Sequence, residues 1–280
     1  MSIPDKIKIV EVGPRDGLQN EKTIIPTDKK IEFINALSEC GFEEIEAGAF
    51  VSPKWVPQMA DSEEIFMRIK RNPKTVYSAL VPNEIGLEKA IKVKVDKIAV
   101  FTAASETFTE KNINASIEES INRFIPVVKN SPVPVRGYVS TAFYCPYEGK
   151  VGPEKPLEVA LRLIEIGCTE ISIGDTIGKA TESDVNELLD MFEKHIEFSK
   201  LSMHFHDTFG NAVNNAIVSA QRGISTFDSS AGGIGGCPFA PGASGNVSTQ
   251  KLVELFKGRT GIDEQKLAQS TGLLTGLLIR

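Results

Sequence analysis

The 280-residue sequence has few features of membrane, nucleic-acid-binding or disulfide-bonded proteins. No uninterrupted apolar run approaches the ~18 residues of a membrane-spanning helix, so we expect no membrane partner. Acidic residues outnumber basic ones, 37 to 31, and the formal net charge is −6. Broad binding to nucleic acid is therefore not expected, because it requires clustered positive charge. The four cysteines form no CxxC pair, and the start MSIPDKIKIVEVG has no basic leader followed by an apolar stretch. We therefore predict free thiols and a cytoplasmic location.

Short β-rich runs alternate with helical stretches along the whole sequence, which is typical of parallel α/β folds. The eight predicted strands are Ile7–Val12, Glu44–Ala47, Thr75–Leu80, Lys97–Thr102, Val135–Ser140, Glu170–Gly174, Leu201–His206 and Thr226–Ala231. Apolar residues at helical spacing predict helices between them, among them Thr27–Cys40, Ile117–Lys129, Pro156–Ile166, Glu182–Phe198 and Ala212–Arg222. Thr27 and Ser116 are expected as N-caps, Pro156 at a first helical position, and Gly41, Gly167 and Gly223 after helix ends.

Two architectures share this alternation, a closed (β/α)₈ TIM barrel and an open doubly wound sheet. The count of eight favours the barrel, as one catalytic domain over residues 1–280 with a short C-terminal helix over about 263–280. The polar residues also favour closure, because a barrel gathers the groups that follow its strands onto one face. The residues at or just beyond predicted strand ends are Arg15, Asp16, Glu46, Asp175, His204 and His206.

The strongest local signal is the segment MHFHD in the seventh predicted strand. Because side chains alternate in a strand, His204 and His206 share one face. Two adjacent imidazoles form half of a metal site, although they could also be ordinary polar residues at a strand end. The chain has only three histidines, so two in one strand favour metal ligation. The third, His195, is expected on the surface.

Other strand ends supply the remaining ligands of such a site. Asp16 follows the first predicted strand and Asn246 follows the eighth, and these strands are neighbours in a closed barrel. A shell of one carboxylate, one amide oxygen and two imidazoles suits Mg²⁺ or Mn²⁺ better than thiolate-bound zinc. We therefore expect a divalent cation as cofactor.

Two glycine-containing loops complete the set of candidate segments. In EVGPRDGLQN, Gly13, Pro14 and Gly17 bend the chain and direct Arg15 and Asp16 toward the barrel mouth; a weak surface ion pair is the alternative. The loop from Ala231 to Asn246 contains six glycines, which permit close backbone approach and hinge motion. Its Cys237 is interpreted as a reactive group, although a lone cysteine is more often a small buried apolar residue.

The segments RDGLQNEK, HFHDTFGNA and GGIGGCPFAPGASGN together resemble the 3-hydroxy-3-methylglutaryl-CoA lyases of the DRE-type TIM-barrel metallolyase superfamily. The similarity extends over essentially the whole chain and includes EAGAFVSPKWVPQMAD, ALVPN, YVSTAFYCPYEG and SIGDTIG. It implies a metal-dependent lyase that cleaves the substrate to acetyl-CoA and acetoacetate by a retro-aldol reaction, in leucine degradation and ketone-body formation. It also suggests a homodimer.

The resemblance implies a role for each matching residue. Asp16, His204, His206 and Asn246 match metal ligands. Arg15 matches an electrophilic catalyst and Cys237 a mobile-loop cysteine. The expected catalytic residues are Arg15, Asp16, Glu46, Asp175, His206 and Cys237, and the expected contacts to the small acyl-CoA substrate come from Arg15, Gln19 and Lys22.

Three other functions stay open from the sequence. The first is a Claisen-type acyl-CoA condensing synthase of the same superfamily, which the cysteine-containing GGCP loop disfavours. The second is a lyase for a longer-branched 3-hydroxyglutaryl-CoA, because the sequence does not determine the pocket volume. The third is a barrel that binds metal without catalysis, since fold alone does not establish activity.

Overall fold

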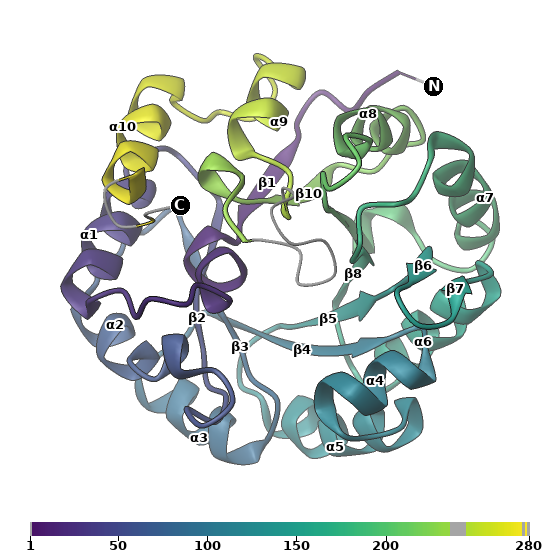
Figure 1. Ribbon diagram of the computed structural model, residues 1–280, viewed down its shortest axis with the longest axis horizontal. Coiled ribbons are helices and arrows are strands. Elements are labelled where there is room, and N and C mark those ends of the chain that lie inside the picture. The colour runs from purple at the N-terminus through teal and green to yellow at the C-terminus, as the bar shows by residue number, and fades with distance from the viewer. Residues whose placement is uncertain (1, 236–244, 276–277, 279–280) are drawn as a thin grey trace.

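Eight parallel strands close into a barrel surrounded by helices in the computed structural model, which describes residues 2–235, 245–275 and 278 (Figure 1). The order around the barrel is β1-β10-β9-β8-β5-β4-β3-β2, so the first and last strands pair and close the sheet. The (β/α)₈ fold predicted from the sequence is confirmed. The strands are β1 (Lys8–Glu11), β2 (Glu44–Ala49), β3 (Val76–Leu80), β4 (Lys97–Ala103), β5 (Val135–Ser140), β8 (Glu170–Asp175), β9 (Leu201–Phe205) and β10 (Thr226–Ser229); β6 (Tyr144–Cys145) and β7 (Gly149–Lys150) form a separate hairpin.

The helices form an outer ring around the barrel (Figure 1). They are α1 (Thr27–Ser38), α2 (Ser62–Arg68), α3 (Glu84–Lys92), α4 (Glu106–Ile113), α5 (Ile117–Asn130), α6 (Glu154–Glu165), α7 (Glu182–Phe192), α8 (Ala212–Gln221), α9 (Thr249–Leu255) and α10 (Glu264–Thr275). Capping boxes begin α5 and α7, at Ser116 and Thr181. The predicted left-handed residues Gly41, Gly167 and Gly223 all have positive φ.

Two predicted helix starts are wrong. Thr27 does not cap α1, because Pro26 is the N-cap residue and the Thr27 hydroxyl donates to Asp61 Oδ2 at 2.9 Å instead. The helix α6 begins at Glu154, two residues before Pro156. Proline is tolerated anywhere in a first turn, where its missing N–H has no helical acceptor, so its position alone did not locate the first residue.

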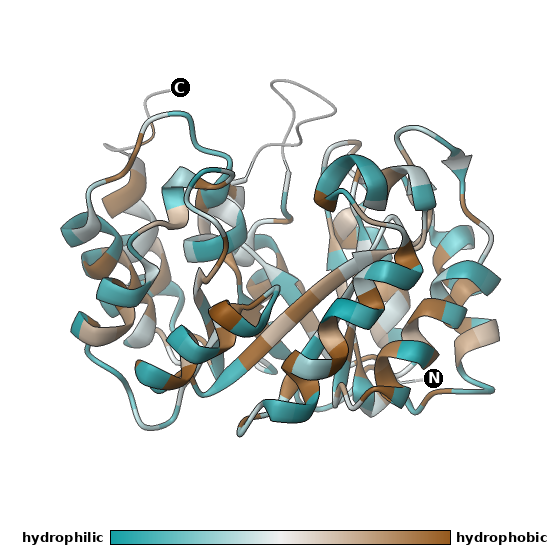
Figure 2. Cartoon of the chain, turned by 90° about the horizontal axis from the view of Figure 1, so that it is seen from below, coloured by the Kyte–Doolittle hydropathy of each residue, from teal (hydrophilic) through white to brown (hydrophobic). Residues whose placement is uncertain are grey.

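The main apolar core lies between the sheet and the helices. Alternate strand residues such as Ile9, Ile45 and Phe227 are buried there, and the helices turn their apolar sides inward (Figure 2). Gly137 of β5 shows how close this packing is, because a Cβ at this position would lie 2.9 Å from Leu163 Cδ1. The helices are thereby held on the outside of the barrel, and the barrel interior is left to the other strand face.

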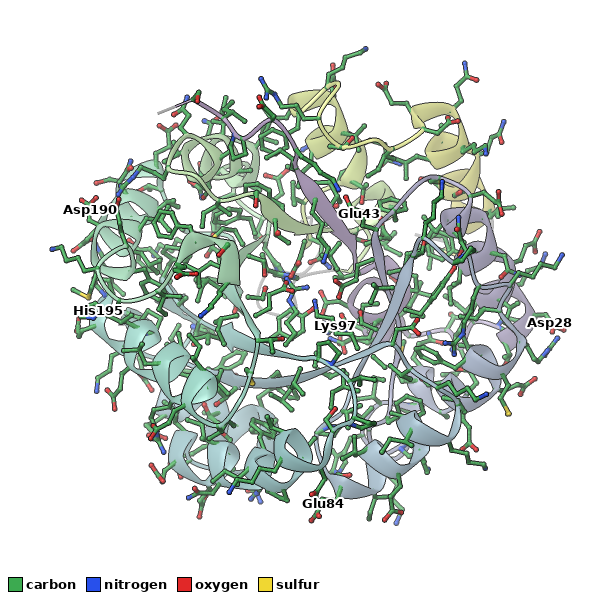
Figure 3. All side chains as sticks on the ribbon, turned by 180° about the vertical axis from the view of Figure 1, so that it is seen from behind. Asp28, Glu43, Glu84, Lys97, Asp190 and His195 are labelled. Carbon is green, nitrogen blue, oxygen red and sulfur yellow. The ribbon has the colours of Figure 1, made fainter. Side chains whose placement is uncertain are left out.

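The interior of the barrel is polar and charged. Lys97 lies in the middle of it, whereas His195 lies at the outer edge, as expected (Figure 3). Lys97 Nζ is 3.0 Å from Glu44 Oε2 and also pairs with Glu170, and Arg136 Nε is 3.2 Å from Glu170 Oε1. These charged side chains form a continuous set of contacts between strands on opposite sides of the barrel. No such interior was predicted.

The C-terminal helix α10 packs beside α1 (Figure 1). Asp263 N donates to Cys40 O at 2.8 Å, and Cys40 Sγ lies 3.4 Å from Ser270 Oγ. Cys40 is one of three described cysteines, with Cys145 and Cys168, and all three are buried free thiols. In the described part of the chain, no helix has the length and apolar character needed to cross a bilayer.

Candidate active site

The turn after β1 brings two charged side chains over one end of the barrel. Residues Gly13–Gly17 form a π-helical turn, η1, in which the N–H groups of Arg15, Asp16 and Gly17 all lie within 3.2 Å of Val12 O. Single π-helical turns are rare in proteins, and those that occur often lie at functional sites. Because β1 runs toward this end, η1 lies at the carboxyl-terminal face, where TIM barrels place their active sites.

Asp16, His204 and His206 converge at this face. One ligand atom from each lies within 4.8 Å of the other two. The imidazole rings of His204 and His206 have centroids 5.3 Å apart, so they share one side of the strand as predicted. The three residues come from the ends of β1 and β9, which lie on either side of β10.

Asn246 joins this cluster through backbone pairing with the end of β9. It forms an isolated bridge with His206, and Val247 N donates to Phe205 O at 3.0 Å. The side-chain Nδ2 donates to Asp16 Oδ2 at 2.7 Å. Gly235 packs directly against it, since a Cβ there would lie 2.7 Å from Asn246 Nδ2.

The chemistry of these four residues fits a divalent cation. Asn246 Oδ1 and His206 Nδ1 are buried and have no hydrogen-bond partner, as expected for groups whose partner is an ion. Burial opposes ionisation of Asp16, but Arg15 and both histidines outweigh it and lower the pKa of this carboxyl. Burial, assisted by His204, lowers the pKa of His206 to about 4, so its imidazole is neutral at pH 7. Oxygen and neutral nitrogen donors of this kind suit Mg²⁺ or Mn²⁺.

Arg15 is held beside the cluster by two carboxylates. Its Nε and Nη2 each lie 2.6 Å from Glu46 Oε2, and its Nη1 donates to Asp16 Oδ1 at 2.7 Å. The guanidinium also lies 5.4 Å from the centroid of the Tyr138 ring. Because a guanidinium carries five N–H groups, two remain to bind a substrate oxygen.

Glu46 combines burial with one free oxygen. Its Oε2 accepts from Arg15 and from the Tyr138 hydroxyl, the latter at 3.3 Å, whereas Oε1 is buried without a partner. Burial raises the pKa of Glu46 even though Arg15 acts in the opposite direction. The free oxygen is therefore a further buried group available to a ligand, in addition to Asn246 Oδ1 and His206 Nδ1.

The other predicted residues occupy different places. Gln19 contacts the cluster, donating from Nε2 to Asp16 Oδ1 at 3.1 Å, and Lys22 is exposed on the loop that follows η1. The side chain of Asp175 forms no hydrogen bond or ion pair with the cluster among the described residues, although its backbone carbonyl accepts from His206 N at 3.3 Å. It accepts from Lys179 N at 3.1 Å and Ala180 N at 3.0 Å, and burial raises its pKa to about 7. Cys237 lies outside the described residues.

Three residues beside the cluster were missed by the sequence reasoning. Tyr138 lies between Arg15 and Arg136, whose guanidinium is 5.0 Å from its ring centroid. Asp228 lies 3.2 Å from His204 Nδ1 and 2.6 Å from Arg136 Nη2. The signal that could have found them is a polar or charged residue at alternate positions of an otherwise apolar strand, as in VRGYV and STFDS.

The sequence matches the family described as HMGL-like over residues 6–273. It is 50% identical over 274 residues to the rat protein named 3-hydroxy-3-methylglutaryl-CoA lyase, cytoplasmic, covering 96% of this chain and 80% of the relative. It is 48% identical over 285 residues to the rat hydroxymethylglutaryl-CoA lyase named mitochondrial, covering 100% of this chain and 88% of the relative.

The solved structure of an HMG-CoA lyase from A. baumannii in complex with coenzyme A and 3-methylmalate has a similar fold. The TM-score is 0.93 at 36% sequence identity, and the match covers 99% of this chain and 93% of that one. The sequence comparison and the fold comparison thus both find proteins named as HMG-CoA lyases.

Proposed function

Because the chain belongs to the HMGL-like family, we infer that it is a metal-dependent lyase that cleaves 3-hydroxy-3-methylglutaryl-CoA to acetyl-CoA and acetoacetate. The level of identity to lyases over nearly the whole chain supports this activity. The observation that carries it is the convergence of Asp16, His204 and His206 within 4.8 Å at the catalytic face of the barrel. Arg15 lies directly beside them, so the groups needed for cleavage are adjacent.

We propose that Asp16, His204, His206 and Asn246 hold the cation, with Mg²⁺ or Mn²⁺ as its identity. A bound divalent cation supplies Lewis-acid polarisation of the substrate's hydroxyl and carboxylate oxygens. His206 or Asp16 accepts the hydroxyl proton, because both lie at the cluster and Asp16 is ionised at neutral pH. The C2–C3 bond then breaks, the C3–O bond becomes the ketone of acetoacetate, and the electron pair passes to the thioester fragment.

Arg15 has the position and the charge to stabilise that fragment. The electron pair forms the enolate of acetyl-CoA, and its oxygen accepts from the two N–H groups of Arg15 that Glu46 and Asp16 leave free. Cys237 stays a prediction as the group that returns a proton to the enolate carbon and completes acetyl-CoA. Asp175 stays a prediction as a catalytic residue, and its bonds to backbone N–H groups support a role in holding the loop after β8.

The acyl-CoA thioester enters, in this proposal, past Gln19 and Lys22. Gln19 contacts Asp16, and the exposed Lys22 ammonium suits the phosphates of the coenzyme. The A. baumannii lyase, which binds coenzyme A, supports this class of substrate. We also propose a homodimer and a cytoplasmic location; the relatives named above include both a cytoplasmic and a mitochondrial enzyme.

The condensing-synthase alternative receives no support from the two rat relatives, since both are named lyases. The longer-branched 3-hydroxyglutaryl-CoA stays a second substrate to test. Purified protein is stripped of metal, and acetoacetate release from 3-hydroxy-3-methylglutaryl-CoA is measured with and without added Mg²⁺ or Mn²⁺. We expect release that depends on the cation. Consumption of acetyl-CoA with a 2-oxo acid, and no acetoacetate, would contradict the proposal in favour of the synthase.

A further inference from the structure

The two nitrogens of the His204 ring face different carboxylates. Nε2 lies 3.9 Å from Asp16 Oδ2 in the cluster, and Nδ1 lies 3.2 Å from Asp228 Oδ2 on the side of the barrel interior. A neutral imidazole has one N–H and one lone pair. If Nδ1 holds the proton, it donates to Asp228 and the lone pair of Nε2 faces the cluster.

Asp228 is itself fixed from several strands. It lies on β10 beside His204 in the strand register, and its carboxylate is fully buried. Oδ1 is 2.6 Å from Arg136 Nη2, and Oδ2 accepts from Ser172 Oγ at 2.9 Å. The carboxylate therefore cannot rotate away from His204 without breaking bonds to β5 and β8.

The contacts of Asp228 distinguish two possible roles. A purely structural ion pair would need only Arg136, which also contacts Glu170. Oδ2 instead serves both Ser172 and His204, and neither Ser172 nor Arg136 accepts the Nδ1 proton. Among the described residues, only Asp228 is within hydrogen-bond distance of Nδ1.

We propose that Asp228 is a positioning residue that keeps the proton of neutral His204 on Nδ1 and so leaves Nε2 free to bind the divalent cation. This inference rests on the proposed metal centre. A partner of this kind orients a ligating histidine and typically changes metal affinity by ~10–100-fold when removed. It acts through His204 and touches no reacting atom.

The test is Asp228→Asn, which keeps the shape of the side chain. The amide oxygen takes the place of Oδ1, because only an acceptor satisfies Arg136. The amide NH₂ then takes the place of Oδ2 and donates to Nδ1, which moves the ring proton to Nε2. We expect this change of tautomer in ¹⁵N NMR spectra of the metal-free protein, where three histidines make assignment by substitution practical. We also expect the dissociation constant for Mn²⁺, measured by electron paramagnetic resonance, to rise ~10–100-fold.

Glu170→Gln is the matched control. It makes the same carboxylate-to-amide change in the same buried network, beside Arg136, but no hydrogen bond or ion pair of the described residues joins Glu170 to His204. We expect an unchanged tautomer and Mn²⁺ affinity within about threefold of wild type, below the range for a lost partner. An equal loss in both variants, or no change in Asp228→Asn, overturns the proposal.

The wild-type spectrum gives a second test if Asp228→Asn does not fold. In metal-free wild-type protein, at a pH high enough for the His204 ring to be neutral, a single proton on Nε2 overturns the proposal without any variant, and a single proton on Nδ1 supports it. Failure of the proposed function has a different result, since wild-type protein would then release no acetoacetate with Mg²⁺ or Mn²⁺. An active wild type whose Asp228→Asn variant binds Mn²⁺ normally contradicts only the role of Asp228.

Discussion

The pKa values of individual acidic residues in this protein shift in different directions because their buried surroundings differ. Asp16 has a lowered pKa, since Arg15 and the two histidines outweigh burial. Glu46 shares Arg15 but has a raised pKa, because burial dominates. Burial also raises the pKa of Glu11 to about 7, although it accepts from Thr249 and two backbone N–H groups. The carboxyl group is thus favoured as a charged ligand at Asp16 and takes up a proton more readily at Glu11 and Glu46.

At the residue scale, Arg15→Gln should lower kcat by ~10²–10³, the usual cost of removing one group that stabilises a developing oxyanion. Affinity for Mn²⁺ should change little, because Arg15 contacts the cluster through Asp16 but donates no ligand atom. Steady-state kinetics and Mn²⁺ titration of the same preparation separate the two effects. A variant with near-normal turnover would remove Arg15 from this role.

Glu11→Gln tests the effect of burial on a carboxyl outside the cluster. Because the folded pKa of about 7 lies above the usual value of 4.5, Glu11 stabilises the fold below pH 4.5 and loses that contribution as pH rises through 7. The amide keeps the acceptor for Gly13 N and Ala231 N and donates to Thr249 Oγ1. Relative to wild type, the variant should therefore gain unfolding free energy between pH 4.5 and 7, by about 3 kcal/mol at most.

Urea unfolding at a series of pH values measures this difference. The exposed Glu39, changed to Gln, is the control and should show no such trend. A difference between Glu11→Gln and wild type that stays constant with pH would mean that Glu11 is ionised in the folded protein throughout this range.

At the element scale, the strands were predictable and the inward side chains were not. Runs of β-branched and aromatic residues such as Val135–Ser140 predict a strand from local sequence, and this strand is present as β5. Barrel interiors are usually filled by branched apolar residues. The alternation in VRGYV could have placed Arg136 inside the barrel, but it does not identify the carboxylates on other strands with which Arg136 pairs. Asp175 shows the converse. Asp175 lies three positions after Ser172 in β8, and Ser172 faces Asp228 inside the barrel. Because side chains alternate along a strand, this spacing places the Asp175 side chain on the outer face of β8.

The conformation of the loop after η1 is held by hydrogen bonds from a side chain of another loop, Gln58. Gln58 is buried, accepts from Ile25 N at 3.0 Å and donates to Thr23 O at 3.0 Å and Glu21 O at 3.3 Å. Lys22 lies within this bonded segment. The position of the proposed acyl-CoA contact is therefore set by the loop between β2 and α2.

Gln58→Met should raise KM for the acyl-CoA roughly tenfold with little change in kcat, because binding contacts move while the metal cluster stays in place. It should also cost about 1–3 kcal/mol of unfolding free energy, since the Ile25 N–H is left buried without an acceptor. Asn35→Leu is the control, because Asn35 Oδ1 accepts from Lys70 N before β3, at the opposite end of the barrel. It should leave KM unchanged. A normal KM in Gln58→Met would contradict the link between this loop and substrate binding.

At the scale of the whole molecule, charged rather than apolar side chains occupy the barrel interior near the amino-terminal ends of the strands. Lys97 is nearly buried between two carboxylates, Glu44 and Glu170, and Lys8 Nζ lies 2.6 Å from Glu44 Oε2. Burial opposes ionisation of Glu44, but Lys97 and Lys8 lower its pKa to about 2. Ion pairs thus link the first residues of β1, β2, β4 and β8 across the barrel interior.

Lys97→Met should for this reason destabilise the fold by about 3–5 kcal/mol, because Glu44 and Glu170 would remain buried without their shared cation. Lys6→Met is the matched control. Lys6 pairs with Glu43 at 3.0 Å, but its side chain is 72% exposed, so its loss should cost under about 1 kcal/mol. Adding Glu44→Gln to Lys97→Met should restore part of the stability, since one uncompensated charge is removed. Urea unfolding of the four proteins measures these terms, and equal losses for Lys97→Met and Lys6→Met would show that water reaches the barrel interior and screens its charges.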